Sequence, residues 1–353
     1  MADLFDNPMG TDGFEFVEYA HKQPEQLDIL FKNFGFKKTA THKSKKVSLY
    51  QQGGINFILN SEPNSFAMQF VETRGAGVCA MAFRVKDARQ AYKRALEKGA
   101  KPVNVPIGTG EMKIPAIEGI GGSILYLVDK YGEKGSIYDT DFNFIDKKTH
   151  PGAGLTYIDH LTHNVNRGNM EKWADFYATL FNFREIRYFD IEGKLTGLKS
   201  KAMTSPCGKI RIPINESSDD KSQIEEFLQR YKGEGIQHIA LGTDDIFATV
   251  ETLQKSGVHF QTTLDTYYKN VSKRVPGHGE DLARMQKLNI LVDGAPTKGQ
   301  GLLLQIFTTD AIGPIFFEII QRKGNEGFGE GNFQALFESL EEDQIRRGVL
   351  KAQ

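Results

Sequence analysis

The chain has 353 residues, and its 44 Lys and Arg residues nearly balance its 45 Asp and Glu residues, for a formal net charge of −1. This length leaves room for two domains that each bury a core of their own. A chain so close to neutral has no electrostatic basis for binding nucleic acid or an anionic membrane surface. We therefore expect neither as a partner.

The amino terminus has no basic start followed by an apolar stretch, which argues against a secretory signal. No uninterrupted apolar run approaches the ~18 residues of a membrane span. The two cysteines, Cys79 and Cys207, lie in an apolar strand-like run and in a Pro-Cys-Gly turn, so no disulfide framework is expected. These features predict a reduced, cytoplasmic protein.

Four units follow one another along the chain, and each consists of a strand, a helix and further strands. The first spans about 13–60, and its helix at about 24–34 carries apolar residues at the i, i+3, i+4, i+7 spacing. The second spans about 78–145, the third opens at Ile158 and the fourth opens at Ile236. Four units of one kind predict two domains of two units each.

Residues 146–154 are polar and rich in Gly and Pro, which is typical of a linker. We therefore predict a structural domain over 1–150 and a catalytic domain over 151–353. The polar stretch 267–300 has no counterpart in the first half and is predicted to contain an exposed loop.

A glycine-rich segment near the carboxyl end leads to a predicted helix with Phe333, Leu336, Phe337 and Leu340 on one side. A hinge of this kind could let the helix close over a site as a lid. Simple packing of the helix on its domain is the alternative.

The two halves repeat each other in sequence. Residues 75–82 read GAGVCAMA and residues 233–240 read GEGIQHIA. Both segments lead to a helix that an Asp opens and a Gly ends, and two further segments match between the halves. These correspondences are Asp87 with Asp245, Gly99 with Gly257, 34–36 with 181–183 and 122–127 with 313–318. An internal repeat indicates a duplicated fold.

Three polar residues interrupt apolar, strand-like runs of the second half: His160, His238 and Glu318. Burying such side chains is costly unless they are paired or bind a metal. Two imidazoles and one carboxylate on neighbouring strands form the facial triad that suits non-haem Fe(II) and leaves one face of the metal open. The sequence therefore predicts an iron site in the second domain.

The first half lacks these polar groups. When the halves are aligned, the three predicted ligands fall on Phe16, Ala80 and Leu127, which are all apolar. We expect the first domain to bind no metal.

Alternatives exist for two members of the triad. His163 is the rival of His160, but residues three apart in a strand face opposite sides and cannot share a metal. For Glu318, a buried salt bridge with Arg322 or Arg184 is the structural alternative.

Two further features need interpretation. Residues 327–332 read GFGEGN between a strand and a helix, but the last position is Asn and no alternating strand-helix domain surrounds it. We therefore reject a dinucleotide site.

Gln237 directly precedes a predicted ligand, so it should face the other side of its strand unless the strand bulges there.

Five motifs together resemble the bacterial 4-hydroxyphenylpyruvate dioxygenase family. The resemblance covers essentially the whole chain, and its motifs are DHLTHNV at 159–165, GIQHIA at 235–240, LLQIF at 303–307, FEIIQR at 317–322 and GFGEGNF at 327–333. The family has the vicinal-oxygen-chelate fold. The resemblance thus implies an α+β protein with two tandem domains, each of two βαβββ modules forming an open β-barrel, and a C-terminal helix over the active site.

The resemblance also implies one Fe²⁺ per subunit, held by His160, His238 and Glu318, and no organic cofactor. The family's pocket residues carry over to the following positions. Gln237, Gln305, Asn215 and Ser200 are implied as catalytic, and Gln223, Phe307, Phe316, Phe328 and Phe333 as substrate-binding, with Phe307 and Phe333 flanking the substrate ring.

The implied reaction converts 4-hydroxyphenylpyruvate and O₂ to homogentisate and CO₂, a step of tyrosine and phenylalanine catabolism. A homo-oligomer, dimer or tetramer, is implied as well. A 4-hydroxymandelate synthase uses the same triad and substrate, and a metal-dependent isomerase of the glyoxalase type uses the ion only as a Lewis acid. Both remain open, while a non-enzymatic, cell-lytic protein has little support in the sequence.

Overall fold

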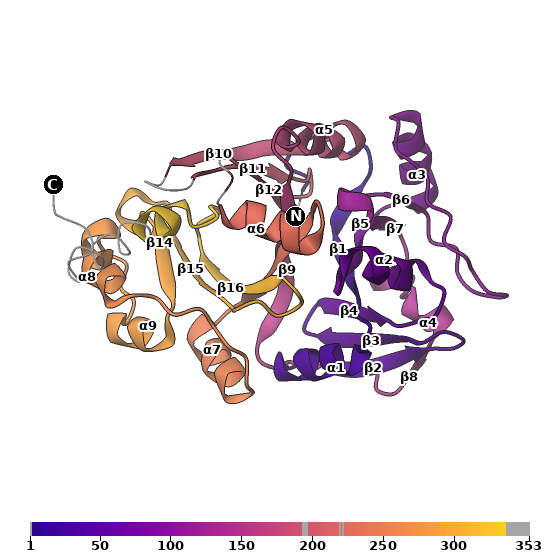
Figure 1. Cartoon of the computed structure of the whole chain (residues 1–353), viewed down its shortest axis with the longest axis horizontal. Helices are drawn as coiled ribbons and strands as arrows, with labels where there is room; N and C mark the ends of the chain where they lie inside the picture. The colour runs from indigo at the N-terminus through magenta and orange to yellow at the C-terminus, as the bar shows by residue number, and fades with distance from the viewer. Residues whose placement is uncertain (1, 193–196, 219, 221, 337–353) are drawn as a thin grey trace.

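The computed structural model describes residues 2–336 except 193–196, 219 and 221. Two eight-stranded mixed sheets with helices on their flanks form the molecule, which confirms the predicted α+β class (Figure 1). Residues 330–336 are helical, as predicted, whereas Phe337 and Leu340 lie outside the described residues. None of the described helices is long and apolar enough to cross a bilayer.

The first sheet has the strand order β6-β7-β5-β1-β4-β3-β2-β8. Its elements in chain order are β1 (Thr11–Ala20), α1 (Pro24–Asn33), β2 (Lys37–His42), β3 (Val47–Gln52), β4 (Ile55–Asn60), α2 (Phe66–Arg74), β5 (Gly77–Val85), α3 (Ala88–Glu97), β6 (Ala116–Glu118), the short 3₁₀ helices η1 (Ile120–Gly122) and η2 (Gly132–Lys134) on either side of β7 (Ile124–Val128), α4 (Tyr138–Asp141) and β8 (Phe142–Phe144).

The second sheet has the strand order β10-β11-β12-β9-β13-β16-β15-β14. Its elements are β9 (Leu155–Val165), α5 (Met170–Phe181), β10 (Arg184–Glu192), β11 (Gly197–Thr204), β12 (Arg211–Ser217), α6 (Gln223–Tyr231), β13 (Gly235–Thr243), α7 (Ile246–Lys255), α8 (Asp265–Arg274), α9 (Leu282–Leu288), β14 (Leu291–Gly294), η3 (Pro296–Lys298), β15 (Leu302–Phe307) and β16 (Phe316–Lys323).

The repeat is visible in the strand pairing. In each sheet the first strand pairs antiparallel with the strand that opens the second module, β1 with β5 and β9 with β13. The helices α3 and α7 begin as predicted, because the side chains of Asp87 and Asp245 accept hydrogen bonds from backbone N–H groups in the first turn. One module departs from the βαβββ pattern: β8 pairs with β2 at the opposite edge of the first sheet.

The predicted counterpart of Glu318 is wrong by one residue. Glu318 pairs with Ala240, and the matching pair in the first sheet joins Tyr126 to Ala82. Tyr126, rather than Leu127, therefore occupies the equivalent position. The alignment started from glycines that precede the two strands, but strand register is set by pairing and not by the length of the incoming loop.

The stretch 267–300 contains a mostly exposed loop at 275–281, as predicted, but most of the stretch is α8, α9 and β14. Tyr267, Tyr268 and Met285 are buried there. Polar residues on the outer faces of these short helices hid their apolar sides.

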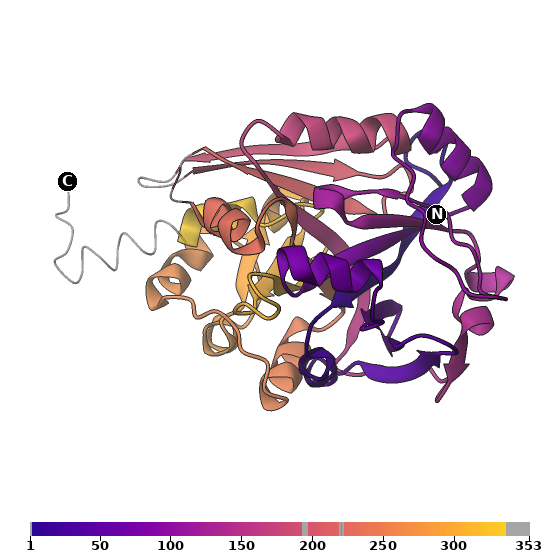
Figure 2. The same cartoon turned by 45° about the vertical axis from the view of Figure 1, so that its right-hand side comes forward.

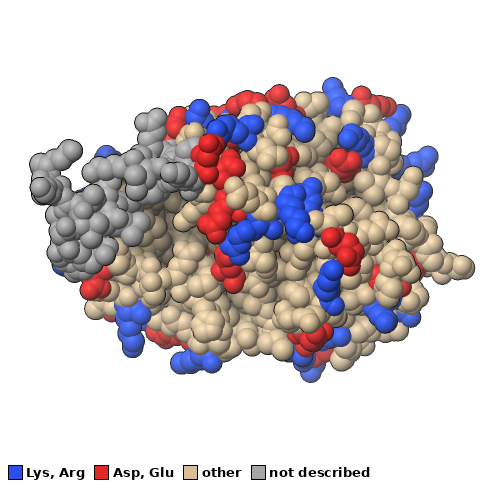
Figure 3. Space-filling view, in the orientation of Figure 1, with Lys and Arg blue, Asp and Glu red and all other residues tan. Residues whose placement is uncertain are grey.

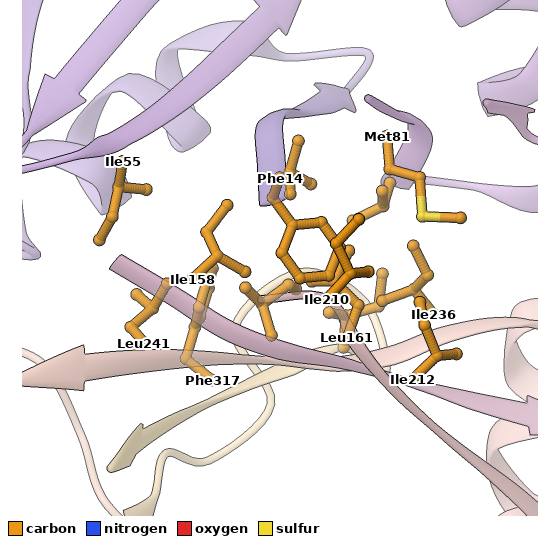
Figure 4. Close-up of a cluster of buried hydrophobic side chains, with 14 of the residues drawn as sticks. Phe14, Ile55, Met81, Ile158, Leu161, Ile210, Ile212, Ile236, Leu241 and Phe317 are labelled. Atoms are coloured by element: carbon orange, nitrogen blue, oxygen red, sulfur yellow. The ribbon is translucent and has the colours of Figure 1, made fainter. Parts of the chain in front are cut away.

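The two sheets stand back to back, with β1 and β9 near the middle of the molecule (Figures 1 and 2). A single apolar core fills the space between them, and Phe14, Ile55 and Met81 of one domain face Ile158 and Leu161 of the other (Figure 4). Their opposite, concave faces therefore turn away from each other. The space-filling view shows Lys and Arg interspersed with Asp and Glu on the face presented, without a large patch of one sign (Figure 3).

The shared core predicts that the domains unfold together. Phe34 is buried at the end of α1, with its ring centre 4.6 Å from that of Phe317 on β16. Phe34→Ala should lower the free energy of unfolding by about 3–5 kcal/mol because it leaves a cavity at the junction. Urea unfolding followed by fluorescence and circular dichroism measures this loss. The control Ile29→Ala, on an exposed position of the same helix, should change stability by less than about 0.5 kcal/mol.

Candidate metal centre

His160, His238 and Glu318 lie on β9, β13 and β16, three neighbouring strands at the centre of the second sheet. The register places His160 and Glu318 opposite Ala240 on its two neighbouring strands. His238 lies two residues before Ala240 on β13 and pairs with Phe316 of β16. All three polar side chains are almost fully buried and line a cavity on the concave side. Residues far apart in sequence thus share one small volume.

The three candidate ligand atoms form a nearly equilateral triangle. Oε2 of Glu318 lies 3.2 Å from Nε2 of His160 and 3.3 Å from Nε2 of His238, and the two ring nitrogens are 3.4 Å apart. Two ligand atoms bound at right angles, each about 2.1 Å from a metal, lie about 3.0 Å apart. The triangle therefore fits one face of an octahedral metal site, with the remaining positions toward the cavity.

No other group of three His, Cys, Asp or Glu side chains in the described part of the chain has this arrangement. His163 lies outside the triangle, since its Nε2 is 2.6 Å from the Tyr177 hydroxyl. Burial lowers the pKa of His163 to about 3, so this ring stays neutral within the core.

A β-bulge brings Gln237 and His238 to the same cavity. Ile236 pairs with His163 and His238 with Thr162, so Gln237 is an extra residue on β13. A bulge re-aims neighbouring side chains. Gln237 accordingly lines the cavity, with Oε1 3.0 Å from Nδ1 of His238. Gln237 was expected to face away from the side chain of His238 unless the strand bulges. The bulge is present, so both side chains reach the cavity.

A second bulge sets Asp159 beside the ring of its neighbour His160. Oδ1 of Asp159 lies 2.7 Å from Nδ1 of His160. Arg322 donates to both oxygens of Asp159, from Nε at 2.7 Å and from Nη2 at 2.8 Å. A carboxylate on the far ring nitrogen fixes the tautomer that leaves Nε2 free for a metal. Sequence reasoning missed Asp159, although an acidic residue directly before a predicted ligand in an apolar strand was the available signal.

The salt bridge considered as an alternative for Glu318 is wrong. Arg322 binds Asp159 instead, and the guanidinium of Arg184 lies 4.2 Å from the centre of the Phe5 ring. Glu318 has no arginine partner among the described residues, so its charge is balanced only within the triad.

The triad is poised for a cation. Burial opposes ionisation of Glu318, but the facing rings of His160 and His238 lower its pKa to about 2. Burial lowers the pKa of His238. Burial would also lower the pKa of His160, but the nearby carboxylates of Glu318 and Asp159 have the larger effect, and the pKa of His160 is raised. Arg322 likewise overcomes burial and holds the pKa of Asp159 well below its usual value. A metal ion would replace the proton that these carboxylates favour on His160.

Gln305 lies behind the triad and does not line the cavity. Its Nε2 donates to Oε1 of Glu318 at 3.0 Å, and its Oε1 accepts a hydrogen bond from Asn332 at 2.9 Å. Tyr267 in turn donates to Asn332 at 2.6 Å. This chain of buried bonds holds one carboxylate oxygen and leaves the other, Oε2, directed at the two imidazoles.

The cavity beside the triad has a volume of about 360 Å³, which is sufficient for a small aromatic acid. Every predicted site residue except Gln305 lines it. Besides the triad these are Ser200, Asn215, Gln223, Gln237, Phe307, Phe316, Phe328 and Phe333. Leu336, which was predicted to lie on the same side of the C-terminal helix as Phe333, lines the cavity as well. The wall also contains residues that sequence reasoning did not single out: Thr162, Phe189, Leu198, Pro213, Ser222, Ile224, Gln261, Thr262, Leu264 and Glu330.

Aromatic rings enclose the two imidazoles. Phe316 stacks on His238 with ring centres 4.9 Å apart, and the ring of Phe328 meets His160 edge to face at 5.3 Å. Phe333 lies on the helical segment 330–336 and faces Phe307 at 6.4 Å. This segment therefore covers part of the cavity, as the predicted C-terminal helix requires.

Family comparisons agree with this arrangement. Residues 5–143 match the family described as "Hydroxyphenylpyruvate dioxygenase, HPPD, N-terminal", and residues 157–281 match the "Glyoxalase/Bleomycin resistance protein/Dioxygenase superfamily". Tandem sheets of this topology with a candidate metal triad in one of them define a member of the glyoxalase and dioxygenase class.

Individual relatives narrow the class. The chain is 62% identical to a 4-hydroxyphenylpyruvate dioxygenase of Pseudomonas aeruginosa, over 98% of this chain and 97% of that protein. It is 63% identical to the protein titled Hemolysin VllY of Vibrio vulnificus, over 98% of both chains. A solved mutant of 4-hydroxymandelate synthase from Streptomyces coelicolor has the same fold, with a TM-score of 0.82 over 95% of this chain at 24% identity, and is covered completely.

The chain belongs to the 4-hydroxyphenylpyruvate dioxygenase family. This membership confirms the resemblance drawn from the motifs and the fold that the resemblance implied.

Removing a triad side chain should abolish retention of a divalent metal. Glu318→Ala and His160→Ala each remove one of three ligands, so the variants should lose bound Fe²⁺ on anaerobic gel filtration while circular dichroism stays unchanged. His163→Gln is the matched control and should retain metal, because His163 bonds to Tyr177 rather than to the triad. Loss of metal from the control would show that the wrong histidine was assigned.

The ion pair behind His160 predicts a weaker, graded effect. Asp159→Asn removes the charge that orients the ring, and metal affinity should fall by about 10–100-fold without complete loss. Anaerobic competition with a chelator gives the affinity. An affinity equal to that of the unmodified chain would contradict the role of Asp159.

Proposed function

We propose that this chain is an Fe(II)-dependent 4-hydroxyphenylpyruvate dioxygenase that converts 4-hydroxyphenylpyruvate and O₂ to homogentisate and CO₂. One observation carries the proposal: a facial triad opens into a cavity of about 360 Å³ whose wall carries the rings of Phe189, Phe307, Phe316, Phe328 and Phe333. The names of relatives at 52–62% identity support the substrate.

Fe²⁺ is the proposed ion, bound by His160, His238 and Glu318. Two neutral imidazoles and one carboxylate are the donor set of non-haem Fe(II) oxygenases, and the triangle of ligand atoms fits such a site. When bound, the ion supplies the Lewis acidity and redox chemistry for decarboxylation and hydroxylation with O₂. It would retain one positive charge, which suits an anionic 2-oxo acid.

The cavity walls have two proposed tasks. Phe307 and Phe333 face each other and would flank the substrate ring, with Phe316 and Phe328 packed around the imidazoles. These rings exclude water, which protects a reactive oxidant from side reactions. The helical segment 330–336, which carries Phe333, completes the enclosure.

Polar side chains on the cavity wall would orient the substrate. Ser200 and Asn215 are direct partners on β11 and β12, and both line the cavity. The Oε1 atom of Gln237 faces Nδ1 of His238, so the amide NH₂ group remains to donate to the substrate. Gln223, on the first turn of α6, is a further donor for the phenol end.

Gln305 receives a different task. Because it bonds to Glu318 and lies outside the cavity wall, we assign it to positioning of the carboxylate rather than to contact with substrate.

The remaining proposals concern the whole protein: assembly into a homo-oligomer, location in the cytoplasm, one iron per subunit, and division of the chain near residue 150.

Product identity tests the proposal. The chain loaded anaerobically with Fe²⁺ and 4-hydroxyphenylpyruvate should, on admission of air, consume one O₂ per substrate and release homogentisate and CO₂. Oxygen uptake and chromatography of the product measure both, with the Glu318→Ala variant as the inactive control.

The same assay separates the rivals. 4-Hydroxymandelate as the main product would assign the chain to the synthase, which hydroxylates the benzylic carbon. Turnover without oxygen uptake would favour a Lewis-acid isomerase. Absence of turnover, with lysis of red cells by the pure chain, would favour the activity that the Vibrio relative's title names.

A further inference from the structure

The first domain encloses a cavity of about 600 Å³ on the concave face of its sheet, larger than the 360 Å³ cavity of the second domain. Both volumes fall in the range of small-molecule sites. The first cavity turns away from the second domain, and the segment between α3 and β6 runs along its outer side at the right of Figure 1. The domain without a metal triad has therefore kept a hollow interior.

The strand register shows that this cavity lies at the position in the first sheet that corresponds to the triad cavity in the second, but different side chains line it. Phe16 takes the position of His160, and Tyr126 takes that of Glu318. The two rings lie against each other with centres 5.6 Å apart and line the cavity. An aromatic pair in place of an imidazole and a carboxylate excludes a metal site of the kind found in the second domain.

Glu18 is the buried carboxylate on the wall of this cavity, which His42, Lys45, Arg89, Glu111, Lys113 and Asp141 also line from partly or fully exposed positions. Glu18 takes the position of Thr162 and is 8% exposed. Its Oε1 accepts a hydrogen bond from the Asn60 amide at 2.7 Å, and the Cys79 thiol, a weak donor, lies beside the residue with Sγ 3.6 Å from the Glu18 backbone carbonyl oxygen. Burial raises the pKa of Glu18, which shows how little its surroundings compensate the charge.

Glu18 differs from two other buried carboxylates, Glu15 and Asp159, which have arginine partners. Glu15 pairs with Arg84 at 2.5 Å and Asp159 with Arg322 at 2.7 Å. Among the described residues, no cation lies within ion-pair distance of Glu18. Burying an unpaired carboxylate is costly.

The nearest candidate cation is already engaged. Lys45 acts on Glu18 only at longer range, because its ammonium is bound to Glu111 at 2.6 Å. Glu111 also accepts hydrogen bonds from Ser44 and from the backbone of Gly108. These contacts tie the segment between α3 and β6 to the β2–β3 hairpin, so they close the cavity and leave Glu18 for an incoming group.

We propose that the first domain binds a protonated amine with an apolar or aromatic body, whose ammonium group donates to Glu18. The faces of Phe16 and Tyr126 provide the cation–π surface that favours an ammonium ion. Val47, Ile58 and Ile114 line the same cavity and offer apolar contacts to the body of the ligand. An anion of equal size would meet the Glu18 carboxylate at the buried part of the cavity, because the cations Lys45, Arg89 and Lys113 lie on its partly or fully exposed wall.

Phenethylammonium is the probe, and phenethyl alcohol and phenylacetate share its body but lack the positive charge. Calorimetry on the full metal-free chain should show one amine per chain, with binding at least about tenfold weaker for the alcohol and undetectable for the acid. Equal binding of amine and alcohol would overturn the proposal, as would the absence of any binding at millimolar concentration.

Variants locate the site. Glu18→Gln keeps the shape and removes the charge, so it should weaken amine binding by at least about tenfold, and Tyr126→Leu by about threefold to fivefold. Glu318→Gln, in the other domain, should leave the affinity unchanged. Loss of binding in Glu318→Gln with retention in Glu18→Gln would place the amine in the catalytic cavity and sink the idea.

A measurement on the unmodified chain covers the case in which Glu18→Gln fails to fold. With methyl-labelled protein, nuclear Overhauser effects should connect the ring of the probe to Ile58 and Ile114, which line the first cavity. Contacts only to Ile224, which lines the second cavity, would contradict the proposal.

Discussion

A carboxylate buried between two imidazoles is the interaction on which the site depends. Glu318 has no arginine or lysine partner among the described residues, and its Oε2 lies within 3.3 Å of both ring nitrogens. Such a cluster is costly in an apolar sheet unless a cation compensates it. The ion pair of Asp159 with Arg322 and the amide of Gln305 hold the cluster from behind and fix the orientation of its side chains.

The two sheets share one fold but differ in the side chains on their concave faces. Both sheets have the same strand pairing, bulges near the same positions and a hollow concave face. The first places Phe16, Ala80 and Tyr126 where the second places its triad. Because the back-to-back core joins the convex faces, side chains on the concave faces can change without loss of the fold. The first domain thus supports the second through packing and retains a cavity of its own.

Much of the site was predictable because polar residues in apolar strands stand out. His160, His238 and Glu318 carry that signal, and the repeat showed that scaffold alone does not require them. Gln305 carried the same signal but binds Glu318 instead of lining the cavity. Its position depends on the Asn332 side chain, which comes from another element. A sequence pattern can indicate that a polar residue is buried, but it cannot identify the group that forms a hydrogen bond with that residue.

The sequence by itself determined the duplicated α+β architecture and which residue types carry the chemistry, because apolar periodicity and internal repeats are local properties of a chain. Tertiary structure decided the register, and with it that Tyr126 and not Leu127 matches Glu318. It also decided the bulges that turn Asp159 and Gln237 toward the site. Register and bulges depend on hydrogen bonds between strands far apart in sequence, and no single strand contains that information.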